Sequence, residues 1–395
     1  MGSTVLPVDQ LRASLTASEI IVPGDNGYKD SLHRWSEAAE KPAAYVVQVT
    51  SAQDISKALL LAQEHQLDVA VVGGGHSTSG SSSTNGGLVV DLTKMRNVTV
   101  EYANKTIKAE AGCIWEDVDY AAAKYGLATV SGTVNNTRYG LTINNLLGAE
   151  VILADGRVAL RGAGQSFGVA TSFTFCGYKQ ANSVYGGLLV FKPEALDKSG
   201  MVVGFSAPAP ASKVSVLTII FYNGDQAKAK EYFAPLFALG PLADLTREMP
   251  YGDVNAMLNT VSTQGDQKTQ KGSAFSAPLS ISLAKTLLED YSKFIIEVPD
   301  AVKSIILMDF FSQREVNKVS QTAMSFANRG EHYNILFGTR WEKTGDGVRE
   351  YGNYEGVATS LAQDIFGVNY EKVLALKKQY DPKNVFNKGA GKFLL

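Results

Sequence analysis

A run of three glycines directly after a β-branched segment is the feature that most constrains how this chain folds. Val69–Val72 predicts a buried strand, and the glycines that follow allow positive φ angles that other residues rarely adopt. Successive N–H groups in such a loop form a concave site for an anion such as phosphate. The residues of this predicted cofactor loop are Gly73, Gly74, Gly75, His76, Ser77, Thr78, Ser79 and Gly80. His76 adds a nucleophile, although a loop histidine can also be an ordinary hydrogen-bonding residue.

The composition excludes several classes of partner. The chain has 395 residues, 45% hydrophobic and 19% charged, which is an ordinary globular composition long enough for two or three domains. Its 37 basic and 39 acidic residues give a formal net charge of −2, so no positive field attracts nucleic acid or an anionic membrane. A small molecule or a cofactor is therefore the expected partner.

Cysteine content and the N-terminal residues bear on the compartment. Cys113 and Cys176 are too few for a disulfide framework, and the first residues have neither a charged n-region nor an apolar h-region. No apolar run approaches membrane-spanning length. We therefore expect a cytoplasmic protein without a membrane anchor.

The first half of the chain reads as strands and helices in alternation. Ser51 predicts the N-terminal cap of a helix that follows a β-branched strand. Trp115–Tyr125 predicts a helix that ends at Gly126, and Asp155 with Gly156 between apolar runs is a hairpin signal. These elements indicate an α+β fold.

The second half carries few diagnostic residues. Ser206–Ala211 is a proline-rich join that suggests a domain boundary, and strand-like segments at 214–222 and 302–311 flank helical ones. This pattern predicts a second sheet covered by helices. Residues 369–380 predict a surface helix that packs on the body and ends at Asp381.

Several other kinds of site are disfavoured by spacing. His33, His65 and His332 have no carboxylate or second histidine at metal-ligand spacing, so no metal site is predicted. The glycines at 162–168 lack the third glycine position and the strand-to-helix context of a nicotinamide-binding loop. Gly75–Ser79 ends in serine where a serine-hydrolase motif has glycine.

An aromatic segment near the C-terminus is a second candidate site. If Glu350–Tyr354 is a strand, Tyr351 and Asn353 lie on one face and Tyr354 lies on the other. An ordinary surface strand explains the same pattern.

Through these and other residues, the chain resembles the berberine-bridge-enzyme-like branch of the FAD-linked oxidases, which belongs to the vanillyl-alcohol-oxidase or PCMH-type flavoprotein superfamily. The segments that carry the resemblance are Arg34-Trp35, Val49–Ser51, Gly73–Gly80, Leu141–Asn145, Leu160–Gly168, Tyr351–Tyr354 and Tyr380–Asn384. The resemblance implies an α+β fold in three parts. Residues 1–205 would form a PCMH-type FAD-binding domain with its core at about 38–194, and 206–340 an inserted substrate domain of antiparallel sheet and helices. Residues 341–395 would return to the FAD-binding domain.

The resemblance also implies how the cofactor is held. His76 would bond covalently to the 8α carbon of FAD, and the amides of Gly73–Gly80 would bind the pyrophosphate. The other residues implied to contact FAD are Gly164, Gly168 and Val169 on the adenine side and Asn353 beside the isoalloxazine ring.

The implied activity is an FAD-dependent oxidoreductase. Such an enzyme passes a hydride from an alcohol, an amine or an activated C–H bond of a small organic substrate to flavin N5, and dioxygen reoxidises the flavin. Tyr351 or Tyr354 would accept the substrate proton, and alternation along a strand allows only one of them to face the ring.

Two departures from the family pattern set the alternative. A second glycine-rich segment that relatives carry is missing between Thr137 and Arg138, and so is a helical segment before Ala159-Leu160. No cysteine stands near Val134, so any covalent attachment would use His76 alone. The alternative is a non-catalytic or FAD-deficient relative that serves as a binding or scaffold protein, or a chain whose gaps come from an imperfect gene prediction.

Overall fold

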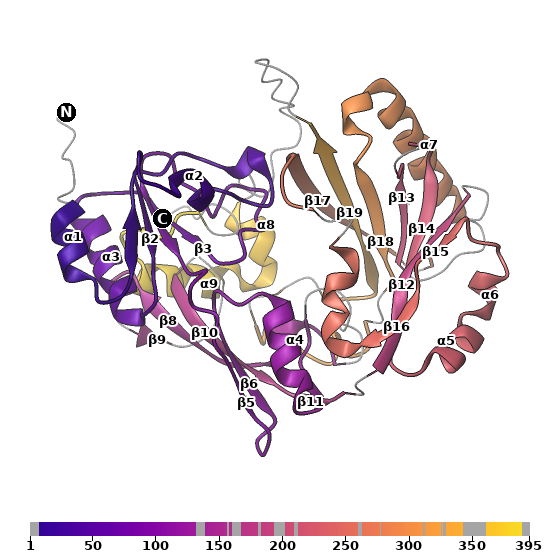
Figure 1. Cartoon of the computed structure of the whole chain (residues 1–395), viewed down its shortest axis with the longest axis horizontal. Coiled ribbons are helices and arrows are strands. Elements are labelled where there is room, and N and C mark those ends of the chain that lie inside the picture. The colour runs from indigo at the N-terminus through magenta and orange to yellow at the C-terminus, as the bar shows by residue number, and fades with distance from the viewer. Residues whose placement is uncertain are drawn as a thin grey trace.

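The computed structural model of the chain describes residues 8–131, 139–155, 158–159, 167–180, 183–192, 202–208, 212–259, 263–276, 278–310, 313–324, 326, 329–342 and 361–388. Sheets of four, five and eight strands and one two-stranded ribbon organise these residues. The four-stranded and five-stranded sheets and the C-terminal helices lie on one side of the molecule, and the eight-stranded sheet lies on the other (Figure 1).

The first sheet delivers the glycine loop. Its order is β1-β2-β4-β3, with β2, β4 and β3 parallel and β1 antiparallel to β2. The strands are β1 (Glu19–Ile21), β2 (Tyr45–Gln48), β3 (Val69–Val72) and β4 (Leu88–Asp91), and the helices of this region are α1 (Val8–Ser14), α2 (Tyr28–Ser31), η1 (Glu37–Ala39) and α3 (Ala52–Glu64). β3 and β4 are buried at every position, as parallel strands usually are. The predicted cap of α3 is confirmed, because the Ser51 hydroxyl accepts a hydrogen bond from the Asp54 N–H at 3.2 Å.

The second sheet is antiparallel, in the order β5-β6-β10-β8-β9. Its strands are β5 (Val98–Glu101), β6 (Thr106–Glu110), β8 (Leu146–Leu153), β9 (Val158–Ala159) and β10 (Gly168–Cys176); α4 (Trp115–Ala123), β7 (Leu127–Ala128), η2 (Thr142–Asn145) and β11 (Tyr178–Lys179) accompany it. β8 and β9 pair antiparallel, with Ile152 opposite Val158, which confirms a hairpin in this region. Gly156, in its predicted turn, lies outside the described residues. Gly126, which follows α4, has φ 61°, as the predicted helix end requires.

The eight-stranded sheet is antiparallel, and β15-β12-β14-β13-β18-β19-β17 run along it, with β16 also paired to β12. Its strands are β12 (Ser183–Phe191), β13 (Val202–Ser206), β14 (Ser215–Tyr222), β15 (Ala243–Asp244), β16 (Arg247–Pro250), β17 (Gln267–Ser276), β18 (Ile305–Asp309) and β19 (His332–Trp341). Its helices are α5 (Gln226–Tyr232), α6 (Ala234–Phe237), η5 (Tyr251–Asp253), η6 (Asn255–Leu258), α7 (Ile281–Glu297) and η7 (Pro299–Ala301). The sequence placed β12 and β13 in the first domain, but both belong to this sheet, because their hydrogen-bonding partners are β14 and β18.

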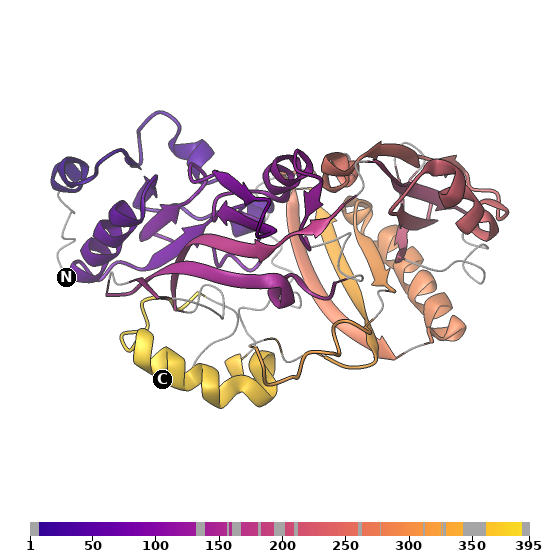
Figure 2. The ribbon, with the colours of Figure 1, turned by 90° about the horizontal axis from the view of Figure 1, so that it is seen from below.

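The C-terminal segment returns to the first part of the chain. It contains α8 (Ala362–Phe366), η9 (Gly367–Asn369) and α9 (Tyr370–Tyr380), which lie beside the five-stranded sheet in Figure 2. Phe366 and Val373 pack with Phe167, and Phe386 is 3% exposed within the core of the first sheet. The predicted return of the C-terminal helix to the body is confirmed.

Candidate functional site

The glycine loop begins where β3 ends and runs close to the second sheet. A Cβ atom on Gly73 would lie 2.9 Å from the carbonyl oxygen of Ala111, so only glycine allows this approach without a shift. Gly75 and Gly80 have φ angles of 68° and 72°, in the left-handed region that glycine adopts without strain. The sequence therefore shapes the loop through glycine at these three positions.

The backbone N–H groups of the loop are open. Those of residues 74–79 make no hydrogen bond within the part of the chain that the structure describes. Unpaired backbone donors normally bind water or a ligand, and a run of them favours an anion. The geometry of the loop thus provides a set of donors for a phosphate or diphosphate group.

Arg34 and Trp35 hold the loop in place. The Trp35 N–H donates to the Gly75 carbonyl at 3.1 Å, and the Arg34 side chain donates to the Ser82 carbonyl from Nε at 3.1 Å and Nη2 at 2.9 Å. Arg34 is 2% exposed, and this burial lowers its pKa. One segment therefore contacts the loop at Gly75 and the chain just beyond the loop at Ser82, and these contacts help to hold the open N–H groups in position.

Hydroxyl groups lie within the loop and directly after it. Ser77 Oγ lies 2.9 Å from Ser79 Oγ and 2.7 Å from Ser81 Oγ. Ser82 and Ser83 bury their hydroxyls, which have no hydrogen-bond partner among the described residues. Buried hydroxyls without partners are costly, so they indicate a polar group that the described residues alone do not supply.

His76 lies exposed beside an apolar cavity. Its imidazole is 6.1 Å from the Trp35 ring, centroid to centroid. Gly74 and His76 line a cavity of about 510 Å³ together with residues of α4, η2, β6 and β10. The larger apolar side chains that line it are Ile114, Trp115, Ile143, Leu146, Phe173 and Phe175. A concave, mostly apolar space with a few polar groups at one side is typical of sites for cofactors and small molecules.

The remaining predicted site residues are only partly described. Val169 lies on β10 with its side chain fully buried in the core shared with the first sheet, and Gly168 precedes it, packed against the Ile152 carbonyl of β8. Gly164, Tyr351, Asn353 and Tyr354 lie outside the described residues.

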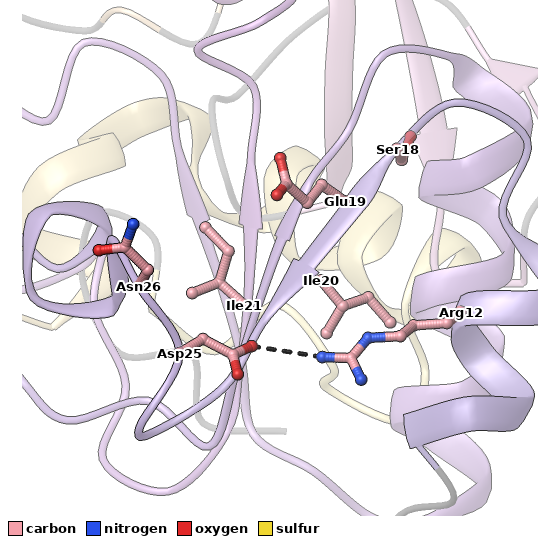
Figure 3. Close-up of a pocket in the computed structure, with 7 residues that line it drawn as sticks. All are labelled: Arg12, Ser18, Glu19, Ile20, Ile21, Asp25 and Asn26. Carbon is pink, nitrogen blue, oxygen red and sulfur yellow. Dashed lines mark hydrogen bonds and ion pairs between the residues drawn. The ribbon is translucent and has the colours of Figure 1, made fainter.

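A cysteine and a second hollow are weaker candidates for a functional site. Burial raises the pKa of the Cys113 thiol to about 11, with Asp117 adding to the effect, so this cysteine is a poor nucleophile. A second hollow of about 420 Å³ lies against β1 and α1, where Arg12 and Asp25 form an ion pair at 3.3 Å (Figure 3). None of the predicted site residues lines it.

The described residues contain neither a metal-binding group nor a membrane-spanning helix. Their histidine, cysteine and acidic side chains form no group of three that could hold a metal ion. Nor does any helix among them combine the length and the apolar character needed to cross a bilayer.

Two buried charged groups escaped the sequence analysis. Lys268 on β17 is 2% exposed and contacts the segment that holds the loop, and Asp119 on α4 is fully buried against η6, where Asn255 donates to its Oδ2. Asp119 follows Trp115 and precedes Ala122, so its place on the buried face of the helix was readable from helical spacing. No local pattern marks Lys268.

Open amide donors, buried hydroxyls without partners, a close glycine approach and an apolar cavity fit a cofactor that has a diphosphate and a flat ring system. The chain matches the model of the FAD binding domain over residues 43–160 and the model of berberine and berberine-like proteins over residues 351–391.

Similar proteins and solved structures that match nearly the whole chain agree with these two family models. The FAD-linked oxidoreductase pgmH of Aspergillus terreus is 28% identical, and the alignment covers 98% of this chain and 96% of that protein. Among solved structures, 6-hydroxy-D-nicotine oxidase from Arthrobacter nicotinovorans has a TM-score of 0.81 at 20% identity and covers 95% and 98% of the two chains. Physcomitrella patens BBE-like 1 has a TM-score of 0.80 at 18% identity and covers 97% and 98%. The chain therefore contains an FAD binding domain and a C-terminal berberine-like segment, has the PCMH-type FAD-binding fold, and is similar over nearly its whole length to FAD-linked oxidoreductases.

Proposed function

We propose that the chain oxidises a small organic substrate at an alcohol, an amine or an activated C–H bond, with dioxygen as the final electron acceptor. The observation that carries this proposal is the set of open N–H groups of residues 74–79, next to His76 and an apolar cavity. The names of relatives add support, because both (R)-6-hydroxynicotine oxidase and chitooligosaccharide oxidase are oxidases.

The residues around the loop would hold the cofactor in two ways. The N–H groups would bind the diphosphate, and Arg34 would keep the loop rigid through its bonds to the Ser82 carbonyl. The apolar walls beside His76 would receive the ring system and exclude water from it. When bound, FAD would supply hydride-acceptor chemistry: the two electrons and the proton of the hydride, together with the second proton that the substrate loses, would reduce dioxygen to hydrogen peroxide.

We propose that His76 carries FAD covalently and that Tyr351 or Tyr354 accepts the proton that the substrate loses. We also propose that Asn353 and Gly164 contact FAD, as the family resemblance implies. Phenylalanine at each tyrosine separates the two candidates: the variant that loses the proton acceptor loses substrate-dependent peroxide formation, and the other retains it. If both variants form peroxide at the native rate, neither tyrosine is the proton acceptor.

The test of the proposal is the visible absorption spectrum of the purified chain before and after acid precipitation. We expect a yellow protein whose flavin stays with the precipitate. His76→Ala should release its flavin into the supernatant, because the covalent bond is lost while the loop donors remain. His65→Ala, at the end of α3, is the matched control and should keep the flavin in the precipitate.

The alternative is a non-catalytic relative that lacks bound FAD. The missing glycine-rich segment between Thr137 and Arg138 supports it, and so does the alignment with pgmH, whose 469 positions exceed the 395 residues of this chain. A colourless protein that stays colourless after refolding with FAD would overturn the oxidase proposal in favour of this alternative.

A further inference from the structure

A set of contacts joins the eight-stranded sheet to the segment that holds the glycine loop. We call it the clasp; it consists of Trp35, Ser36 and Lys268. Lys268 Nζ donates to the carbonyl of Trp35 at 2.5 Å and to those of Thr263 at 2.9 Å and Gly265. The Ser36 hydroxyl donates to the Lys268 carbonyl at 2.8 Å and accepts from its N–H at 2.9 Å. Two segments more than 200 residues apart are thereby locked together.

The clasp continues to His76 through one aromatic ring. Lys268 Nζ lies 4.5 Å from the centroid of the Trp35 indole, within the range of a cation–π interaction. The same indole is 6.1 Å from the His76 imidazole, with the two ring planes inclined at 40°. Lys268 therefore contacts both the backbone and the ring of the residue that packs beside His76.

The clasp contains a buried ammonium group, which is unusual for a contact that only stabilises the fold. A buried ammonium costs free energy unless it is fully hydrogen-bonded, and burial lowers the pKa of Lys268 to about 8. Its hydrogen-bond acceptors are backbone carbonyls, so the ammonium fixes where those carbonyls lie. An apolar residue of similar size would fill the space without defining the position of the Trp35 carbonyl.

We propose that Lys268 is a positioning residue for His76. By holding the backbone and the indole of Trp35, it sets the orientation of the imidazole from which the cofactor is carried. This inference rests on the proposed role of His76 as the attachment residue. It also makes cofactor attachment depend on the substrate-domain sheet, because Lys268 belongs to β17.

The test uses the four histidines of the full chain, labelled with carbon-13 at Cε1 and observed by NMR. His76→Ala assigns the His76 signal. Lys268→Met should shift that signal and leave those of His33, His65 and His332 in place, because the ring current of Trp35 moves relative to His76. Lys268→Arg keeps the charge and the donors and should restore much of the native shift. Lys303→Met is the matched control, because Lys303 pairs with Asp266 and Glu342 at the surface and does not reach Trp35.

A second measurement follows attachment itself. FAD is added to the chain prepared without flavin, and acid-stable flavin is counted over time. Lys268→Met should slow attachment on the order of ten-fold to a hundred-fold, as expected when a reacting group is misplaced by about an ångström. Lys303→Met should react at the native rate.

The outcomes separate this inference from the proposed function. An unshifted His76 signal in Lys268→Met overturns the positioning role, whether or not flavin attaches. A native chain that forms no acid-stable flavin overturns the attachment proposal, and the NMR comparison still decides the positioning of the imidazole. If Lys268→Met does not fold, Lys268→Gln takes its place; it keeps hydrogen-bond donors but loses the cation, and the same shift is expected.

Discussion

Replacing Lys377 with methionine is expected to lower the free energy of unfolding by about 3–5 kcal/mol, the usual cost of removing one partner from a buried ion pair. Lys377 and Asp381 are both fully buried, with Nζ and Oδ2 2.6 Å apart. Nζ also donates to the Phe386 carbonyl at 2.8 Å, and Asp381 accepts from the N–H groups of Val385 and Phe386. Methionine fills the space but leaves the Asp381 charge buried without its cation.

Urea unfolding followed by tryptophan fluorescence measures the loss. Lys378→Met changes the next residue, which is exposed, and should alter stability by no more than about 0.5 kcal/mol. Adding Asp381→Asn to Lys377→Met should recover part of the loss, because the uncompensated charge is gone. A Lys377→Met protein as stable as the native chain would show that the pair does not anchor the C-terminal segment.

Asparagine at position 119 is expected to make the chain more stable than the native protein at alkaline pH. Asp119 is fully buried, its Oδ1 has no partner among the described residues, and burial raises its pKa to about 7. Asn255 donates to Oδ2. Burial raises the pKa of the neighbouring Tyr251, and the Asp119 charge adds to this effect. The neighbouring pair Tyr120 and Asp253 joins α4 to η5 at the same interface.

The sign follows from proton binding. An unfolded aspartate has a pKa of about 3.9, so the folded chain binds more protons than the unfolded chain between about pH 4 and pH 7. Stability from this group therefore falls as the pH rises through that window and levels off above the folded pKa. Between pH 5 and pH 8 the loss should be about 2–3 kcal/mol, and Asp119→Asn should remove it.

Unfolding midpoints at pH 5 and pH 8 check this expectation, with Asp290→Asn on the exposed surface of α7 as the control. The advantage of Asp119→Asn over the native chain should grow with pH, and the control should show no such trend. An advantage that is equal at both pH values would mean that Asp119 is already ionised in the folded chain at pH 5.

Local patterns predicted the elements whose shape depends on neighbouring residues. The Ser51 cap, the pairing of the strands on either side of Asp155 and the C-terminal helix were all readable, because caps, turns and helical spacing involve contacts a few residues apart. The domain boundary expected at residue 206 falls within the eight-stranded sheet, whose first strand in the chain, β12, begins at Ser183. A strand finds its sheet through partners far along the chain, and β12 takes β14, β15 and β16.

The sequence by itself indicated the glycine loop, because glycine alone adopts the positive φ angles and the close backbone approach found there without strain. Motifs spread along the whole chain carried the family resemblance. Helical spacing indicates that Asp119 lies on a buried face, but tertiary structure alone decided that Lys268 is buried and which groups both charges touch. Lys268 reaches Trp35 across 233 residues, and Asp119 reaches Asn255 across 136. The choice of partner arises when separate sheets and helices pack, and no spacing within one segment records it.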